Sequence, residues 1–364
     1  MQRREFGGRL AGGLVGAGMA STGRALAAPK RNLLMHVGGD YHSVVGGRDA
    51  DMTSRANLEY NLRHGVQHLT AKVRKVSSEG AWNLDEMKRM KENCDRHGFT
   101  FEAIRMGTEY IKMRKGSARD RRLENIVENI RKASQVGVEV ITYHWQVIPI
   151  RRNREVPGRG GVTYREFKLE KNWKDLPVEE AGVVSSDDYW ERIAYFLERV
   201  IPVAEEYNVK MACHPYDPPA LPFGYQGAEN WDSPSVFDAI KRYEAVVESP
   251  HNGFQLCLGT VGEGLKNPKA GILPIVEYLG AKRKIHQVHM RNISGGLHDF
   301  LEVFPDEGAM NFLKIMRILR DTQFAWSICS DHMPAHPDDP NKLQAFAFGY
   351  GYFKALIQVV NSEV

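Results

Sequence analysis

The chain has 364 residues, of which 42% are hydrophobic and 26% are charged, and its formal net charge at pH 7 is +4. This length allows one large domain or two ordinary ones, and the composition excludes a collagen, a coiled coil and a disordered protein. The four cysteines are scattered and form no CxxC pair, which excludes a disulfide scaffold. After residue 30 no apolar run is long enough for a membrane-spanning helix.

The first 28 residues have the pattern of an export signal. Arg3 and Arg4 precede Phe6, a glycine-rich and weakly hydrophobic stretch follows, and small residues at 25–28 offer a cleavage site. We expect a twin-arginine signal peptide over residues 1–28, read by the Tat translocase, and hence a periplasmic location. The alternative is an uncleaved anchor or a loose tail. This segment carries a net charge of +3, so the remaining chain is nearly neutral and gives no support for nucleic-acid binding.

From residue 30 onward, short apolar runs typical of strands alternate with amphipathic helical patterns. Residue pairs 187–188 and 233–234 are typical of helix starts, and Gly98, Gly137 and Gly280 are typical of helix ends. The helical patterns include residues 84–97, 120–136, 187–207, 235–247 and 310–322. The eight expected strands cover residues 33–37, 68–71, 99–104, 138–145, 209–214, 254–259, 285–291 and 324–331.

This alternation predicts an α/β fold, a (β/α)8 TIM barrel in a single domain over residues 29–364. An open, doubly wound sheet is the alternative. One connection, after Trp145, runs for about forty residues, which is long for a barrel. It contains Arg151, Arg152, Arg154 and Arg159. We interpret it either as a solvated surface excursion or as a basic lid over an anionic substrate.

Four successive expected strands each end in a residue type that binds metals: His214, Cys257, His289 and Asp331. The C-terminal ends of neighbouring barrel strands converge, so these four side chains are expected to meet. A thiolate among imidazoles and a carboxylate favours Mn, Fe or Zn over Mg or Ca. Taken singly, a strand-end histidine or cysteine is more often a core residue. The coincidence of four favours a metal site with an open position, as in a catalytic centre.

The segments around these residues resemble the motifs of the mannonate dehydratase family. That resemblance implies a xylose-isomerase-like barrel that dehydrates D-mannonate to 2-keto-3-deoxy-D-gluconate with a divalent metal, typically Mn²⁺, with Fe²⁺ as the alternative. Stretches at 119–143 and 300–322 are also similar to the family. The motif segments read HPYDPP at 214–219, LCLGT at 256–260, VHMRN at 288–292 and SDH at 330–332.

The resemblance also implies roles for individual residues. The metal ligands fall on the four strand-end residues, an acid/base histidine falls on His332, and a catalytic tyrosine falls on Tyr350, with Tyr352 as the fallback. Removing the C2 proton and expelling the β-hydroxyl needs one base and one acid, and we expect His332 and Tyr350 to share these tasks. Arg291 is expected either to hold the substrate carboxylate in a fork or to form a structural ion pair. Asn292 and His144 complete the expected substrate-binding residues.

The sequence also departs from the family pattern. Tyr216 stands where the family usually has an acid, and residues 36–42 and 143–145 differ as well. His36, His42, Glu102 and His144 stand at expected strand ends and are candidates to replace family substrate contacts. Two other functions stay open: an isomerase or epimerase of the same barrel type acting on a neutral sugar, and a non-catalytic periplasmic sugar-acid binder. A homo-oligomeric assembly is left open too.

Overall fold

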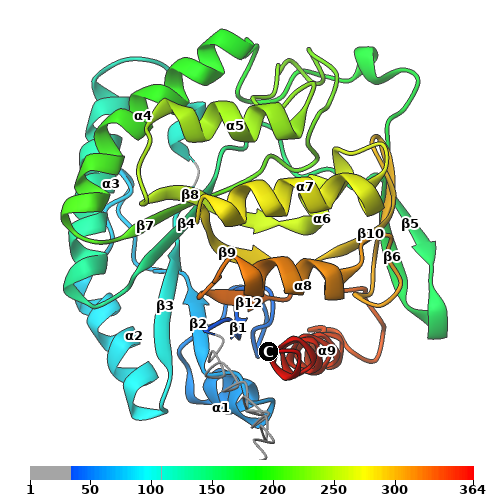
Figure 1. The fold of residues 1–364 in the computed structure, drawn as a ribbon. Helices are drawn as coiled ribbons and strands as arrows, with labels where there is room; N and C mark the ends of the chain where they lie inside the picture. Colours follow the sequence, from blue (N-terminus) through cyan, green and yellow to red (C-terminus); the bar gives the residue numbers. More distant parts are fainter. Residues whose placement is uncertain (1–33, 108) are drawn as a thin grey trace, which may run out of the picture. The chain divides into compact units, whose positions relative to one another are not determined.

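The computed structural model describes residues 34–107 and 109–364, so the export signal expected over residues 1–28 lies outside the described residues. Within these ranges, eight parallel strands close a barrel in the order β1-β12-β9-β8-β7-β4-β3-β2 (Figure 1). The predicted (β/α)8 TIM barrel is therefore confirmed, and the open doubly wound sheet is wrong. Residues 34–364 belong to one compact unit.

The barrel strands are short and buried on both faces, as parallel strands covered by helices must be. Every residue of β8 and β9 is buried, for example. The barrel closes where β1 pairs with β12, with His36 opposite Ser327. The strands are β1 (His36–Gly39), β2 (His68–Ala71), β3 (Thr100–Arg105), β4 (Val140–His144), β7 (Lys210–His214), β8 (Asn252–Cys257), β9 (Ile285–His289) and β12 (Ser327–Cys329).

Helices lie around the outside of these strands (Figure 1). Among the described residues, no helix combines the length and apolar character that a membrane crossing needs. The α-helices are α1 (Arg55–Arg63), α2 (Leu84–Arg96), α3 (Ser117–Gln135), α4 (Ser186–Glu206), α5 (Val236–Val246), α6 (Leu258–Glu263), α7 (Pro268–Ala281), α8 (Phe312–Asp321) and α9 (Leu343–Ser362). Short 3₁₀ turns cover Glu109–Lys112, Arg159–Gly161 and Trp173–Asp175.

The helix ends correct some of the expected boundaries. Ser185 and Ser235 cap α4 and α5, because their hydroxyls accept backbone N–H groups of the first turn. The starts expected at 187–188 and 233–234 were therefore each two residues off. Gly98 and Gly137 do follow helix ends, at φ 70° and 74°. Gly280 lies inside α7, however, and Arg283 takes the left-handed position after that helix, at φ 55°.

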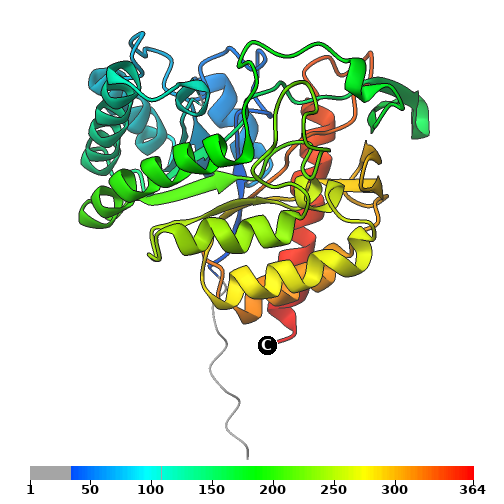
Figure 2. The same ribbon diagram turned by 90° about the horizontal axis from the view of Figure 1, so that it is seen from above.

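A second sheet stands beside the barrel and carries part of the long connection after Trp145 (Figure 2). It has the antiparallel order β10-β11-β6-β5. Its members are β5 (Arg154–Pro157), β6 (Thr163–Lys168), β10 (Asn292–Gly296) and β11 (Asp299–Val303). The connection is thus tied to the hairpin that follows β9, with Phe167 stacked on Phe300 at 5.6 Å between ring centroids. This pairing fixes where the connection meets the end of the barrel.

Candidate active site

All four expected ligand residues converge at the C-terminal end of the barrel. His214, Cys257 and His289 end β7, β8 and β9, and their ligand atoms lie within 4.8 Å of one another. Asp331 follows β12 by two residues. Its Oδ2 lies 3.3 Å from Sγ of Cys257, and its Oδ1 lies 3.5 Å from Nδ1 of His289. The parallel register explains the meeting, because Cys257 is the strand partner of His289.

The hydrogen bonds of the two imidazoles fit a metal between them. Nδ1 of His214 lies 2.6 Å from the carbonyl oxygen of Pro215, which places the ring proton on Nδ1 and leaves Nε2 with the lone pair. Nδ1 of His289 is buried and has no hydrogen-bond partner among the described residues. Its Nε2 lies 2.8 Å from Nε2 of the Gln255 side-chain amide and 3.4 Å from Oδ2 of Asp40. An orphaned buried nitrogen is costly, and a bound cation would satisfy it.

The pKa shifts of the clustered side chains bear on whether they can bind a cation. Burial lowers the pKa of His214 to about 3, so its imidazole is neutral, the form that binds metals. Burial alone would raise the pKa of Asp331, but His332, His289 and Arg291 outweigh this and hold it well below its usual value. Burial raises the pKa of the Cys257 thiol. Metal binding must therefore displace the thiol proton.

His332 lies beside the cluster and faces a small pocket. Its Nδ1 lies 2.6 Å from Oε1 of Glu302, and its Nε2 lies 3.7 Å from Oδ1 of Asp331. The pocket has a volume of about 200 Å³, and both His332 and Asp331 line it. Its wall also carries three basic side chains, those of Arg48, Arg165 and Lys342. The geometry therefore suits an anionic ligand next to the metal ligands.

His42 faces the same pocket from the other side of Asp331. Its Nδ1 lies 3.0 Å from Oδ2 of Asp40, and its Nε2 lies 3.6 Å from Oδ1 of Asp331. The His42 and His332 rings are 5.2 Å apart. Two histidines, each held by a carboxylate, thus point at one space. From the sequence, His42 was expected only as a possible substrate contact, and the signal for its position beside Asp331 is the Asp40-Tyr41-His42 spacing directly after β1.

A buried cluster of ion pairs lies behind the ligands. The side chain of Arg291 is fully buried, and its guanidinium is surrounded by four carboxylates. This arrangement matches the expected structural ion pair, and the expected contact of Arg291 with the substrate carboxylate stays a prediction. The distances from Arg291 are 3.0 Å to Asp217, 2.9 Å to Glu263, 2.6 Å to Glu302 and 3.0 Å to Asp331.

The long connection supplies a second buried cation to this cluster. Arg152 contacts Asp217 at 2.8 Å, Glu263 at 3.0 Å and Glu302 at 2.8 Å. Burial raises the pKa of Glu263 well above its usual value. Burial would do the same to Asp217, but Arg152 and Arg291 together lower its pKa instead. The connection is therefore neither a plain surface excursion nor a free basic lid, because one of its arginines is built into the site.

Tyr350 does not join these residues. It lies in α9, fully buried, and its hydroxyl contacts Oγ of Ser43 at 2.5 Å and donates to Oδ1 of Asn61 at 3.1 Å. Its hydroxyl lines none of the pocket beside His332. In this structure its hydroxyl is hydrogen-bonded within the core, and the expected catalytic role of Tyr350 stays a prediction. What Tyr350 does contact is Ser43, one residue after His42, so it supports the segment that carries that histidine.

Asn292 and Tyr216 also have structural surroundings. The Asn292 amide donates to the carbonyl oxygens of Pro305 and Met310, and its oxygen accepts the N–H of Met310. These bonds hold the chain after β11, and the substrate-binding role expected for Asn292 stays a prediction. Tyr216 is fully buried and accepts the N–H of Ile148 at 3.3 Å. Here an aromatic core residue replaces the acid.

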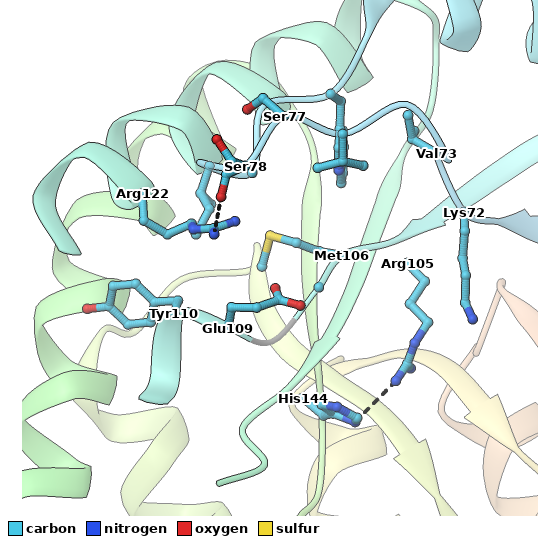
Figure 3. A pocket seen from close by; sticks show the side chains of 15 residues that line it. Lys72, Val73, Ser77, Ser78, Arg105, Met106, Glu109, Tyr110, Arg122 and His144 are labelled. Carbon is cyan, nitrogen blue, oxygen red and sulfur yellow. Dashed lines mark hydrogen bonds between the residues drawn. The ribbon is translucent and has the colours of Figure 1, made fainter. Parts of the chain in front are cut away.

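His144 ends β4 and lines a second, larger cavity of about 490 Å³ above the ends of β2, β3 and β4. Figure 3 shows Arg105 and His144 pointing toward each other, with Nη2 of Arg105 3.2 Å from Nδ1 of His144, and Lys72 on the same side. The ring centroids of His144 and His214 are 6.3 Å apart. This basic cavity is therefore a neighbour of the ligand cluster, and the substrate-binding role of His144 stays a prediction.

His36 and Glu102 are placed elsewhere. His36 begins β1, and Glu102 lies in the first half of β3. Both are therefore at the N-terminal end of the barrel, and the ligand cluster is at the opposite, C-terminal end. The expectation that they contact substrate is wrong, because the first strand begins at His36 instead of ending there.

Comparisons with known proteins agree on one family. The family model described as D-mannonate dehydratase (UxuA) matches residues 53–362. The mannonate dehydratase of Thermotoga neapolitana is 28% identical over 307 residues, which cover 74% of this chain and 82% of that protein. The crystal structure of mannonate dehydratase from Streptococcus suis serotype 2 has a TM-score of 0.73 at 23% identity, covering 90% of this chain and 94% of that one.

The fold itself is shared more widely. A xylose isomerase domain protein from Planctomyces limnophilus has a TM-score of 0.57 at 14% identity, covering 91% of this chain and 99% of that one. The barrel is therefore of the xylose-isomerase-like type.

Two tyrosines offer a matched test of the core role of Tyr350. Tyr350→Phe removes a buried hydroxyl that has two partners, so we expect the free energy of unfolding to fall by roughly 1–3 kcal/mol. The Tyr352 hydroxyl has no hydrogen bond within residues 34–107 and 109–364, so Tyr352→Phe should change stability by less than about 0.5 kcal/mol. Urea unfolding measures both values. Unchanged stability in Tyr350→Phe would contradict this role.

Proposed function

The chain belongs to the D-mannonate dehydratase family, and on that premise we propose that it is a hydro-lyase that converts D-mannonate to 2-keto-3-deoxy-D-gluconate and water. The observation that carries the proposal is the cluster of four strand-end ligand residues, one of which, Asp331, also lines the basic pocket that His42 and His332 face. The ligand residues serve charge stabilisation, the two histidines serve proton transfer, and the basic side chains serve recognition of an acid.

His214, Cys257, His289 and Asp331 would hold the divalent metal, for which we propose Mn²⁺, with Fe²⁺ as the alternative. The mixture of nitrogen, sulfur and oxygen donors supports a transition metal over Mg²⁺ or Ca²⁺. When bound, such an ion supplies Lewis-acid stabilisation of the negative charge that builds on the substrate carboxylate. The orphaned Nδ1 of His289 supports its use as a ligand atom.

We assign the two proton transfers to His42 and His332. One imidazole takes the proton from C2, and the electrons of that C–H bond form the C2–C3 double bond. The other imidazole protonates the departing C3 hydroxyl, which leaves as water, and the resulting enol becomes the 2-keto acid. Asp40 and Glu302 hold the two rings in orientation through Nδ1.

The basic side chains around the site favour an acid as substrate. Arg48 and Lys342 make no ion pair with any residue that the structure describes, and Lys342 donates one hydrogen bond to the Met333 carbonyl oxygen at 2.7 Å, so both retain donors for a carboxylate. The sugar isomerase or epimerase alternative, which acts on a neutral substrate, has no use for these cations. The non-catalytic binder alternative has no use for two oriented histidines. Both alternatives therefore explain less of the site than the dehydratase does.

Replacing either histidine tests the chemical assignment. His332→Asn and His42→Asn should each lower kcat by about 10²- to 10⁴-fold, the usual value of a general acid or base, while bound metal is retained. His97→Asn, at the far end of the barrel, is the matched control and should leave kcat unchanged. The assay measures the 2-keto-3-deoxy product from a panel of aldonates. Metal-loaded protein that forms no such product from any aldonate would favour the isomerase or the binder.

The cysteines test the metal ligands independently of turnover. Cys257→Ala removes one ligand, so its Mn²⁺ affinity should fall by more than the roughly 10- to 100-fold that loss of an outer-shell partner costs. Cys94→Ala removes a buried thiol in α2 and should bind Mn²⁺ like the wild type. Elemental analysis after dialysis gives the content of each. Equal manganese in both variants would contradict the ligand set.

We also propose that the chain is exported to the periplasm by the Tat translocase. The paired Arg3 and Arg4, the weakly hydrophobic stretch and the small residues at 25–28 support this proposal. Because this route carries folded proteins, the metal can be loaded in the cytoplasm. Replacing both arginines by lysine should leave the protein in the cytoplasmic fraction. Periplasmic recovery of this variant at the wild-type level would contradict a twin-arginine signal.

A further inference from the structure

A second group of metal-binding side chains lies at the N-terminal end of the barrel. His36 and His68 begin the neighbouring strands β1 and β2, and Glu102 lies in β3 beside them (Figure 1). Nε2 of His36 and Nδ1 of His68 approach the same oxygen of Glu102, Oε2, at 2.6 and 2.7 Å. The three ligand atoms lie within 4.8 Å of one another.

The hydrogen bonds of His36 require a cation in this group. Its Nδ1 lies 2.7 Å from the carbonyl oxygen of Leu34, which can only accept, so the ring proton is on Nδ1. A neutral ring would then present the Nε2 lone pair to the Glu102 carboxylate, which also only accepts when ionised. Two lone pairs at 2.6 Å repel each other. At this distance a proton lies between Nε2 and the carboxylate, and a metal ion bound by both groups would take the place of that proton after a small outward shift of the two side chains.

The buried negative charge of Glu102 also requires a positive charge beside it. Its side chain is 4% exposed, and among the described residues its ion-pair partners are the two histidines, with no Lys or Arg. Its other oxygen accepts the N–H of Ser327 at 3.0 Å. An uncompensated carboxylate at this depth is costly. The His36 and His68 side chains are 23% and 29% exposed, so an ion can reach the group from solvent.

We propose that His36, His68 and Glu102 form a second divalent-metal site, of a type suited to Zn²⁺. Two imidazoles and one carboxylate are a common protein ligand set for zinc, and solvent on the exposed side completes the coordination. The two rings are stacked at 3.5 Å with a tilt of 27°, so their nitrogens converge on the carboxylate. The site has no thiolate, which distinguishes it from the cluster around Cys257.

The position of this site suggests what a bound ion does. It joins β1, β2 and β3, and through Ser327 it reaches β12, the strand with which β1 closes the barrel. Side chains at the N-terminal end of such barrels serve stability rather than chemistry. An ion that binds only the folded state stabilises it by mass action. Zn²⁺ at this site therefore stabilises the closed barrel where β1 meets its neighbouring strands, independently of the reaction at the other end.

Zinc stoichiometry tests the proposal on the full-length protein. After equilibrium dialysis against Zn²⁺, elemental analysis should find two zinc ions per wild-type chain, one per His68→Gln chain and one per His36→Gln chain. His97→Gln replaces a histidine at the C-cap of α2 and is the matched control, with two ions expected. Wild-type protein that binds a single ion, or two ions retained in both His36→Gln and His68→Gln, would overturn the proposal.

Cobalt separates the two sites spectroscopically. Cys257→Ala should still bind one Co²⁺ ion, without the sulfur-to-cobalt charge-transfer band that the wild type shows. In Cys257→Ala, Zn²⁺ should also raise the melting temperature, and a further His68→Gln substitution should abolish that rise. A Cys257→Ala protein that binds no Co²⁺ would overturn the second site and leave the dehydratase proposal untouched, because the activity assay does not depend on this end of the barrel.

Discussion

The active-site end of the barrel depends on the buried guanidinium of Arg291. It contacts carboxylates from four different segments, those that follow β7 and β12, the end of α6 and strand β11. Removing a charge of this kind from water costs several kcal/mol, and only close and complete pairing offsets the cost. Arg291 therefore fixes the relative positions of these segments. One of its partners is Asp331, so the same contact that organises the cluster also orients one of the four residues proposed to hold the metal.

That constraint extends from the four clustered residues to His42 and His332, the two groups proposed to transfer protons. Glu302 contacts Arg291, Arg152 and Nδ1 of His332, so the orientation of His332 depends on the pairing of both arginines. Asp40 plays the corresponding part for His42 and also approaches His289. Each histidine at the pocket is thus held by a carboxylate that belongs to a wider network. A reaction that removes one proton and delivers another needs such fixed geometry on both sides of the metal ligands.

The sequence predicted that His214, Cys257, His289 and Asp331 would lie together, because parallel strands bring equivalent positions to one edge and the spacing of these residues follows one strand–helix unit each. It could not place Arg152, since a connection of that length has no periodicity that fixes where one side chain meets the barrel. The surroundings of Tyr350 could not be predicted for a related reason, because a helix residue faces whichever side packing dictates. His36 was misplaced because the first strand starts three residues later than expected, which moves it to the opposite end.

The central claim is that the four strand-end residues hold one metal ion beside His42 and His332. Anomalous diffraction at the manganese edge, from crystals grown with Mn²⁺ and D-mannonate, tests it most directly. The account predicts a peak bounded by His214, Cys257, His289 and Asp331, with the sugar acid between the two histidines. A manganese peak away from these four side chains, or a sugar acid bound out of reach of both histidines, would contradict it.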